Sequence, residues 1–336
     1  MAETETTYEV ISLDGTAISK SEQLFSLEEL IEKVQSEEQK YQFIEVKSST
    51  QIVTNNPKAQ PQPGFDIDPS RPTGIYDRQL EPYVPGKLHA VPHHMEFISD
   101  SIRQGERLTS TNNVSVVMSV TKYADGEGQK VSSQEYLTQE QVALIKYDGQ
   151  TLLSQHPDFG EKSLEIAGLK SGLLEPQTGM FEHFEWQPLS EILAGVETSP
   201  AQTAMAFKVN EFDCKITGQG TVGEEPVIIV NCTRTQTLNN LTFNEVAELY
   251  LASNKNYIPA KILWKSITPN STGVQERLVE SWQEVKPGIW YPQKIVIQST
   301  SDNPEIAAPF QETEYQVVSL EPDYPDEFFR SNDPAE

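Results

Sequence analysis

The most regular apolar pattern in the chain predicts helices at two places. Ser26 and Glu29 have the spacing of a capping box, in which each side chain binds the other residue's backbone amide. A helix is therefore predicted over 26–41, and Pro188 to Leu193 with Gly195 behind it predicts a short second helix. The first helix carries one apolar stripe, so we expect it to pack on a sheet; the stripe is Leu27, Leu30, Ile31 and Val34.

Strand patterns dominate from residue 95 onward. Residues 113–123 alternate apolar and polar side chains, and Asp148-Gly149 after 141–147 is typical of a tight hairpin. The C-terminal third contains short runs separated by turn residues, and these are 204–217, 226–235, 245–252, 258–267, 274–285, 289–299 and 311–320. Short connections join antiparallel neighbours, and helix–strand alternation is missing. The pattern predicts a mainly β, α+β chain with a large antiparallel meander.

Proline content divides the chain further. Eight prolines fall between Pro57 and Pro92, which predicts an irregular insertion at about 55–92. We expect residues 1–25 to form an extended arm, 26–325 a single β domain, and 326–336 a C-terminal tail.

The charge balance limits the class of partner. The chain has 50 Asp+Glu against 25 Lys+Arg, a formal net charge of −25, which repels nucleic acids and anionic lipid surfaces. Solubility alone accounts for such acidity, and recognition of a charged partner is the alternative. The longest apolar run is only 227–230, so no transmembrane segment is expected.

Cys214 and Cys232 flank a turn-rich segment. In a hairpin centred near Gly223 they would lie opposite each other, close enough for a disulfide, which would indicate an oxidising compartment. The alternative is that both are small buried hydrophobic residues.

A search for catalytic motifs finds no nucleotide-binding loop, no hydrolase elbow and no zinc-protease pattern. Three of the five histidines, His89, His93 and His94, cluster in the proline-rich stretch, where they are either incidental or ligands for zinc or copper. No acid or cysteine at ligand spacing accompanies them, so we expect no metal, no cofactor and no enzymatic activity.

Apolar and aromatic side chains in the last strands form the main candidate site. By alternation, we expect one face of a curved sheet to carry Ile262, Trp264, Leu278, Trp282, Ile295 and Ile297. This face is either an ordinary core beneath the first helix or the wall of a cavity for an apolar ligand.

Several segments share the helix, turn and hairpin pattern of a known group; they are 27–34 with Tyr41 and 44–47, then 249–262, 284–295 and 325–329. The chain thereby resembles LolA/LolB-type lipoprotein-carrier domains, and most of all planctomycete-like exported proteins of that fold. The resemblance covers both ends of the chain and leaves roughly 55 to 245 weakly covered. It implies a half-barrel closed by helices over a hydrophobic cavity.

The resemblance also implies function and location. Its members are exported, non-enzymatic proteins, so we expect a periplasmic or otherwise extracytoplasmic protein that binds a lipid, an acyl chain or a lipidated protein. A cell-envelope interaction module without a small ligand is the alternative. This chain starts without a basic or apolar leader at Met1 to Thr6, so a cytoplasmic location is the other expectation.

Overall fold

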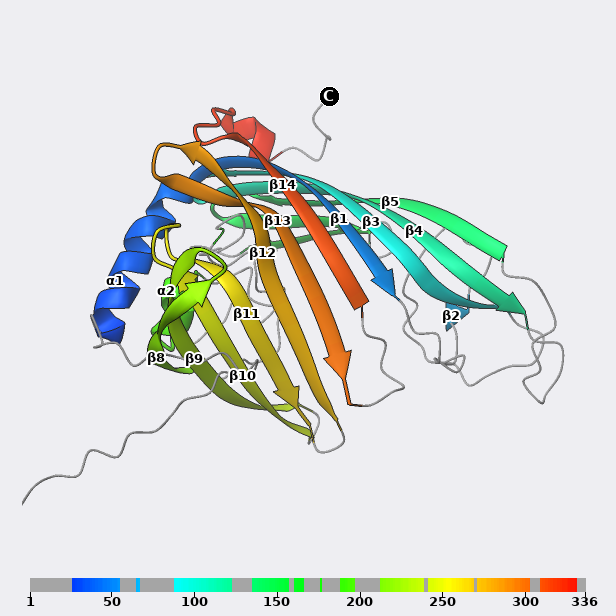
Figure 1. Cartoon of the computed structure of the whole chain (residues 1–336). Coiled ribbons are helices and arrows are strands. Elements are labelled where there is room, and N and C mark those ends of the chain that lie inside the picture. Colours follow the sequence, from blue (N-terminus) through cyan, green and yellow to red (C-terminus); the bar gives the residue numbers. More distant parts are fainter. Residues whose placement is uncertain are drawn as a thin grey trace, which may run out of the picture.

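The computed structural model describes residues 26–54, 65–66, 88–122, 135–156, 160–165, 176, 188–196, 212–238, 241–268, 271–302 and 309–330. In this part the strands form one 14-stranded sheet whose pairings are all antiparallel (Figure 1). The strands are β1 (Phe43–Thr54), β2 (Phe65–Asp66), β3 (Leu88–Gln104), β4 (Arg107–Lys122), β5 (Glu135–Tyr147), β6 (Thr151–His156), β7 (Gly160–Glu165), β8 (Asp213–Val222), β9 (Glu225–Leu238), β10 (Leu241–Ala252), β11 (Ile258–Ile267), β12 (Thr272–Lys286), β13 (Ile289–Ser301) and β14 (Pro309–Ser319).

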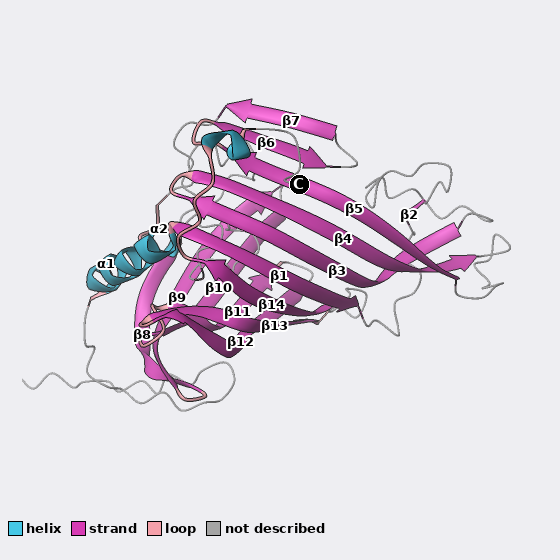
Figure 2. Ribbon diagram, turned by 90° about the horizontal axis from the view of Figure 1, so that it is seen from above, coloured by secondary structure: helices cyan, strands magenta, loops and turns pink. Residues whose placement is uncertain are grey.

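The strand order is β7-β6-β5-β4-β3-β1-β14-β13-β12-β11-β10-β9-β8, with β2 paired to β3 beside this path. We call β1 and β3–β7 the first wing and β8–β14 the second wing. The wings meet where β1 pairs with β14, so the first and the last strand in the sequence are neighbours in the sheet. Figure 2 shows the two wings curving towards each other as an open half-barrel. The predicted mainly β, antiparallel half-barrel is confirmed.

Both predicted helices are present. The capping box of α1 (Leu27–Glu38) forms, since the Glu29 amide donates to Ser26 Oγ at 3.2 Å and the Ser26 amide to Glu29 Oε2 at 2.8 Å. The α-helix ends before the predicted residue 41 and continues as the 3-10 turn η1 (Gln39–Tyr41). In the second helix, α2 (Leu189–Leu193), the chain leaves through Gly195 at φ 65°, a conformation that suits glycine.

The two faces of the sheet differ in what covers them. We call the face beneath α1 and α2 the inner face and the opposite one the outer face. The principal core cluster joins both helices to the second wing; its buried members are Leu30, Val34, Leu189, Ile192, Leu193, Phe212, Cys214, Ile228, Val230, Cys232, Ala247, Leu249, Leu251, Ile262, Val279, Ile295 and Ile297. The helices therefore lie where their apolar stripes predict.

Two predicted boundaries are wrong. β3 begins at Leu88 and includes Pro92, so the irregular insertion cannot extend to residue 92. A register shift follows Pro92, and a proline without an amide donor is tolerated at such a bulge. Residues 1–25 and most of the insertion lie outside the described part of the chain.

The predicted tail at 326–336 also begins too early. The 3-10 turn η2 (Asp326–Phe329) packs on the outer face of the first wing, and Phe329 is only 2% exposed. The Lys146 ammonium donates to the Phe328 carbonyl at 3.1 Å and lies over its ring. The aromatic pair thus fastens this segment to β5, a contact that no local sequence pattern reveals.

Candidate functional site

Four of the six residues predicted to form an apolar wall lie together on the inner face. Ile262, Ile295 and Ile297 are 1%, 4% and 6% exposed, and Trp264 packs on the same cluster while remaining half-buried. These isoleucines belong to the core cluster that also contains apolar side chains of α1 and α2. The described part of this face is therefore a packed core, and its accessible margin lies around Trp264.

Of the other two, Leu278 lies on the outer face, and Trp282 does not belong to one face alone. Ile262 pairs with Arg277, and Arg277 pairs with Ile297, so Arg277 occupies the inner position that was assigned to Leu278. Because side chains alternate along a strand, a displacement of one residue reverses the face. Trp282 lies at a register shift and contacts both the outer cluster and the inner one.

One end of α1 is held by a buried asparagine. Asn256 Oδ1 accepts the Trp290 amide at 2.7 Å and lies 3.0 Å from the Tyr41 hydroxyl, while Nδ2 donates to Gly288 O at 3.0 Å and to Glu37. Asn256 has φ 56°, a left-handed conformation that is uncommon outside glycine. These bonds fix that conformation and join the end of the helix to two hairpins of the second wing.

A second polar contact acts at the same end. Glu38 is 4% exposed, and its carboxylate accepts the Ser190 amide at 2.9 Å and the Ser190 hydroxyl at 2.6 Å. α1 therefore binds α2 through its last residue. At its first turn the capping box is exposed, and Leu27 and Ile31 are only partly buried. Glu37 and Glu38 thus hold the C-terminal end of α1 to the rest of the protein.

A charged pair lies beside the accessible margin. The Arg234 guanidinium is 4.4 Å from the Phe212 ring centre and 5.7 Å from that of Trp264, and it forms an ion pair with Glu245. Burial lowers the pKa of Arg234 and Glu245 opposes this effect, so the arginine keeps its charge at neutral pH. The cation thereby fixes the two aromatic rings at this end of the inner face.

Cys214 and Cys232 are paired across β8 and β9 and are joined by a disulfide. Both belong to the principal core cluster. The sequence left a disulfide and two free buried thiols as alternatives, and the structure contains the disulfide. It links β8, the edge strand of the second wing, to the neighbouring strand β9.

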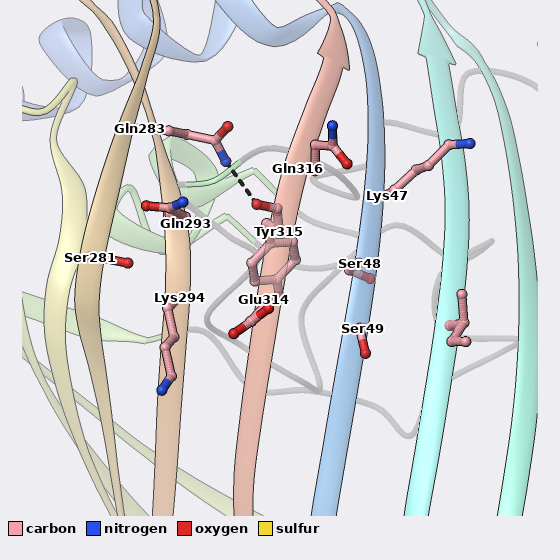
Figure 3. A pocket seen from close by; sticks show the side chains of 11 residues that line it. Lys47, Ser48, Ser49, Ser281, Gln283, Gln293, Lys294, Glu314, Tyr315 and Gln316 are labelled. Carbon is pink, nitrogen blue, oxygen red and sulfur yellow. Dashed lines mark hydrogen bonds between the residues drawn. The ribbon is translucent and has the colours of Figure 1, made fainter.

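A polar cavity lies where β13 and β14 separate. Their pairing runs only from Lys294↔Glu314 to Gln298↔Phe310, and towards the helical end the two strands part. The cavity there has a volume of about 670 Å³ and is lined by β1, β3, β12, β13 and β14 (Figure 3). We call it the slot. Its lining is Lys47, Ser48, Ser49, Ile98, Ser281, Gln283, Gln293, Lys294, Glu314, Tyr315 and Gln316.

Gln283 bridges the slot. Its Nε2 donates to Tyr315 O at 3.1 Å, the bond drawn in Figure 3, and to Pro292 O at 3.3 Å, while Oε1 accepts the Val317 amide at 3.4 Å. A side-chain amide thus replaces backbone pairing between two strands. Sequence reasoning missed this site; the signal was a polar residue at an inner position, opposite the buried Tyr291.

The charges around the slot are mostly paired. Lys294 is 3.2 Å from Glu280 and 2.9 Å from Glu312, and hydrogen bonds to Glu312 and Glu280 raise the pKa of Lys294. Lys47 is 3.3 Å from Asp100. The three carboxylates of these ion pairs and Glu314 of the lining make four negative charges. With the two lysines, the local charge is −2.

The remaining chemistry concerns metal ligands and membrane-spanning helices. Within the described ranges, no three His, Cys, Asp or Glu side chains are grouped to hold a metal ion. The side chains of His89, His93 and His94 fall outside those ranges. Among the helices of the described residues, none has the length and apolar character needed to cross a membrane.

Comparison with known proteins gives no family. No family model matches the sequence, and no curated protein does. A DUF1329 family protein from Desulfovibrio piger aligns with 87% of this chain and 91% of its own, at 10% identity and a TM-score of 0.35. A β-barrel-like protein of the domain of unknown function DUF1849 from Brucella abortus aligns with 83% of this chain and 100% of its own, at 8% identity and a TM-score of 0.19. Scores this low do not establish a common fold. The description of the sheet as a half-barrel therefore rests on its own strand order.

Proposed function

We propose that the protein is a non-enzymatic binding protein that holds an apolar ligand, such as a lipid or an acyl chain, on the inner face of its second wing. One observation carries the proposal: the apolar inner face shares its core with a helix that Glu37 and Glu38 hold at its C-terminal end. Movement of the other end of α1 would uncover Ile262 and its neighbours without breaking the sheet. The resemblance of several segments to lipoprotein carriers supports the same function.

The free energy gained by burying the apolar side chains of α1 is of the same order as that gained by burying an acyl chain. Full burial of an aliphatic side chain contributes roughly 1.5–3 kcal/mol, so Leu30 and Val34 of α1 contribute about 3–6 kcal/mol, and the partly buried Leu27 and Ile31 add a smaller amount. An acyl chain gains about 0.8 kcal/mol per buried methylene, so about twelve methylenes give roughly 10 kcal/mol. A long acyl chain can therefore replace the helix on this face, whereas a short one cannot.

The disulfide bears on location. Disulfides persist in oxidising compartments and are rare in the cytosol, so the Cys214–Cys232 bond supports an extracytoplasmic site of action. There the protein would meet lipids or lipidated partners of the cell envelope.

The test is native mass spectrometry of the purified protein with solvent extraction of any bound molecule, followed by titration with the neutral apolar fluorophore N-phenyl-1-naphthylamine. We expect an extractable adduct of lipid mass and saturable probe binding. Trp264→Ala should weaken probe binding at least ten-fold. Trp290→Ala is the matched control, because Trp290 lies under Lys255 and outside the principal core cluster.

A bare polypeptide mass without probe binding would reject the apolar ligand. Equal effects of the two tryptophan variants would place any binding elsewhere. Circular dichroism of each variant separates a lost site from a lost fold.

An envelope interaction module without a small ligand is the second candidate, and one observation favours it. Ile98 and Val142 on the outer face are 52% and 53% exposed, and both pair with Asn113, so they lie in one row across three strands. A partner docked there should be lost in an Ile98→Ser/Val142→Ser variant. If the wild type and the variant capture the partner equally well, the partner does not dock on this surface.

A further inference from the structure

We propose that the slot between β13 and β14 is a second binding site, which takes an extended peptide segment of neutral or basic charge through main-chain hydrogen bonds. This site is separate from the apolar inner face and does not depend on the function proposed for it. The argument rests on the backbone of its walls, on its polar groups and on its charge.

The walls of the slot are strand edges. Along β14, the Tyr315 carbonyl and the Val317 amide both point to the side where β13 has departed, since Gln283 reaches both. A carbonyl and an amide two residues apart on one strand edge are the pair that the N–H and the C=O of a single residue in a parallel neighbour would engage. The side-chain amide of Gln283 therefore takes the place of one residue of an added strand. An extended peptide binds sheet edges by the same main-chain bonds.

The size and the side chains fit a short segment. A volume of about 670 Å³ lies within the usual range of roughly 300–1,000 Å³ for ligand sites. The lining supplies three serine hydroxyls and three glutamine amides. Each of these groups both donates and accepts, which matches the alternating amides and carbonyls of a peptide.

Charge narrows the class of peptide. Both lysines of the slot are paired with carboxylates, and the local charge is −2. An acidic or phosphorylated ligand would meet this excess and the net charge of −25 of the whole chain. A lysine or arginine in the peptide would instead find Glu314 in the lining.

The aromatic group of the slot argues against a sugar. Sugars are commonly held by a flat ring face, but the Tyr315 ring packs edge-on against Tyr291 with centres 5.8 Å apart. We therefore favour a peptide, and a carbohydrate becomes an outcome of the test.

The experiment uses the full chain and a positional-scanning library of acetylated, amidated pentapeptides, with maltotriose as the carbohydrate probe. Titration calorimetry should find binders enriched in Lys or Arg and lacking Asp and Glu. Gln293→Trp should fill the slot and weaken binding at least ten-fold. Gln298→Trp is the control, since it is an exposed glutamine on the same strand outside the slot.

Main-chain recognition has its own readout. N-methylation of the central peptide amides should abolish binding, and the side-chain amide signal of Gln283 should shift on titration with the unmodified peptide. The proposal is overturned if no library peptide binds, if the N-methylated peptide binds equally, or if maltotriose binds in its place. Trp264→Ala should leave peptide binding unchanged, so failure here and failure of the apolar site are distinguishable.

Discussion

The two wings belong to one sheet, yet their inner faces differ in chemistry. In the second wing most buried inner positions are aliphatic, and they share one core cluster with α1 and α2. In the first wing buried apolar residues such as Val46 stand beside hydroxyls and amides, as in the Ser101–Ser110 bond of 2.7 Å and the bond from Ser99 to Asn112. A buried polar group is stable only when it is hydrogen-bonded, and these pairs satisfy one another across the strands. The two wings therefore bury their inner faces by different means.

The largest effect is expected where the second wing is joined to its cover. Asn256→Ala removes four contacts worth about 1 kcal/mol each, so we expect a loss of about 4 kcal/mol in unfolding free energy. Urea unfolding measures it. Asn254→Ala is the control, because Asn254 makes one exposed bond to Glu225 and should cost below about 1 kcal/mol. Equal costs would remove Asn256 as the anchor of α1.

The contrast between the wings can be measured by truncating one inner residue in each. Ile262→Ala should cost about 3 kcal/mol because it leaves a cavity under the helices. Ser101→Ala should cost about 1 kcal/mol because Ser110 loses its partner. In the double variant Ser101→Ala/Ser110→Ala we expect much of that loss to be recovered. A double variant no better than the sum of the singles would contradict self-satisfied hydroxyl pairs.

Alkaline pH should destabilise the second wing through its buried tyrosines. Burial, followed by Glu37, raises the pKa of Tyr41, and burial followed by Tyr315 and Tyr41 raises that of Tyr291. Each folded-state pKa exceeds the unfolded value near 10, so the contribution is complete below pH 10 and is lost above it. We expect a loss of about 1.4 kcal/mol per pH unit for each tyrosine. Tyr291→Phe should halve this slope in urea unfolding between pH 9 and 11; an unchanged slope would refute the assignment.

The smallest effect concerns the free end of α1. Ser26→Ala removes the cap of the helix and should cost about 1 kcal/mol. Ser36→Ala, at an exposed position inside the helix, should be neutral or slightly stabilising because alanine favours helices. Thermal unfolding distinguishes the two. Under our proposal, Ser26→Ala should also speed uptake of the apolar probe; a slower uptake would argue against movement of this end.

Local chemistry explains which elements the sequence could predict. The Asp148-Gly149 hairpin is stabilised within itself, since Asp148 Oδ1 accepts the amides of Gln150 and Thr151 at 2.9 and 2.8 Å. The hairpin near Gly223 and the capping box of α1 likewise depend on neighbours in the sequence. These three were correct because their partners lie within a few residues or across one turn.

The errors arise where both faces of a strand are buried or where the partner is distant. In β12, Leu278 and Val279 are adjacent, apolar and on opposite faces, so alternation alone could not identify the inner one. The slot depends on the separation of β13 from β14 and on Gln283 reaching across it. Neither feature has a local pattern, so Leu278 was placed on the inner face in place of Val279 and the polar site was missed.

The seam between β1 and β14 has a consequence for biosynthesis. β1 cannot pair with β14 until the ribosome has synthesised more than two hundred and fifty further residues. Until then β1 exposes one edge, beside β3, and the growing chain carries an unfinished sheet. We therefore expect the two wings to form separately and to join only after β14 has left the ribosome. A nascent chain stalled before residue 309 would be an open, aggregation-prone intermediate, and a chaperone that shields strand edges would matter most at that moment.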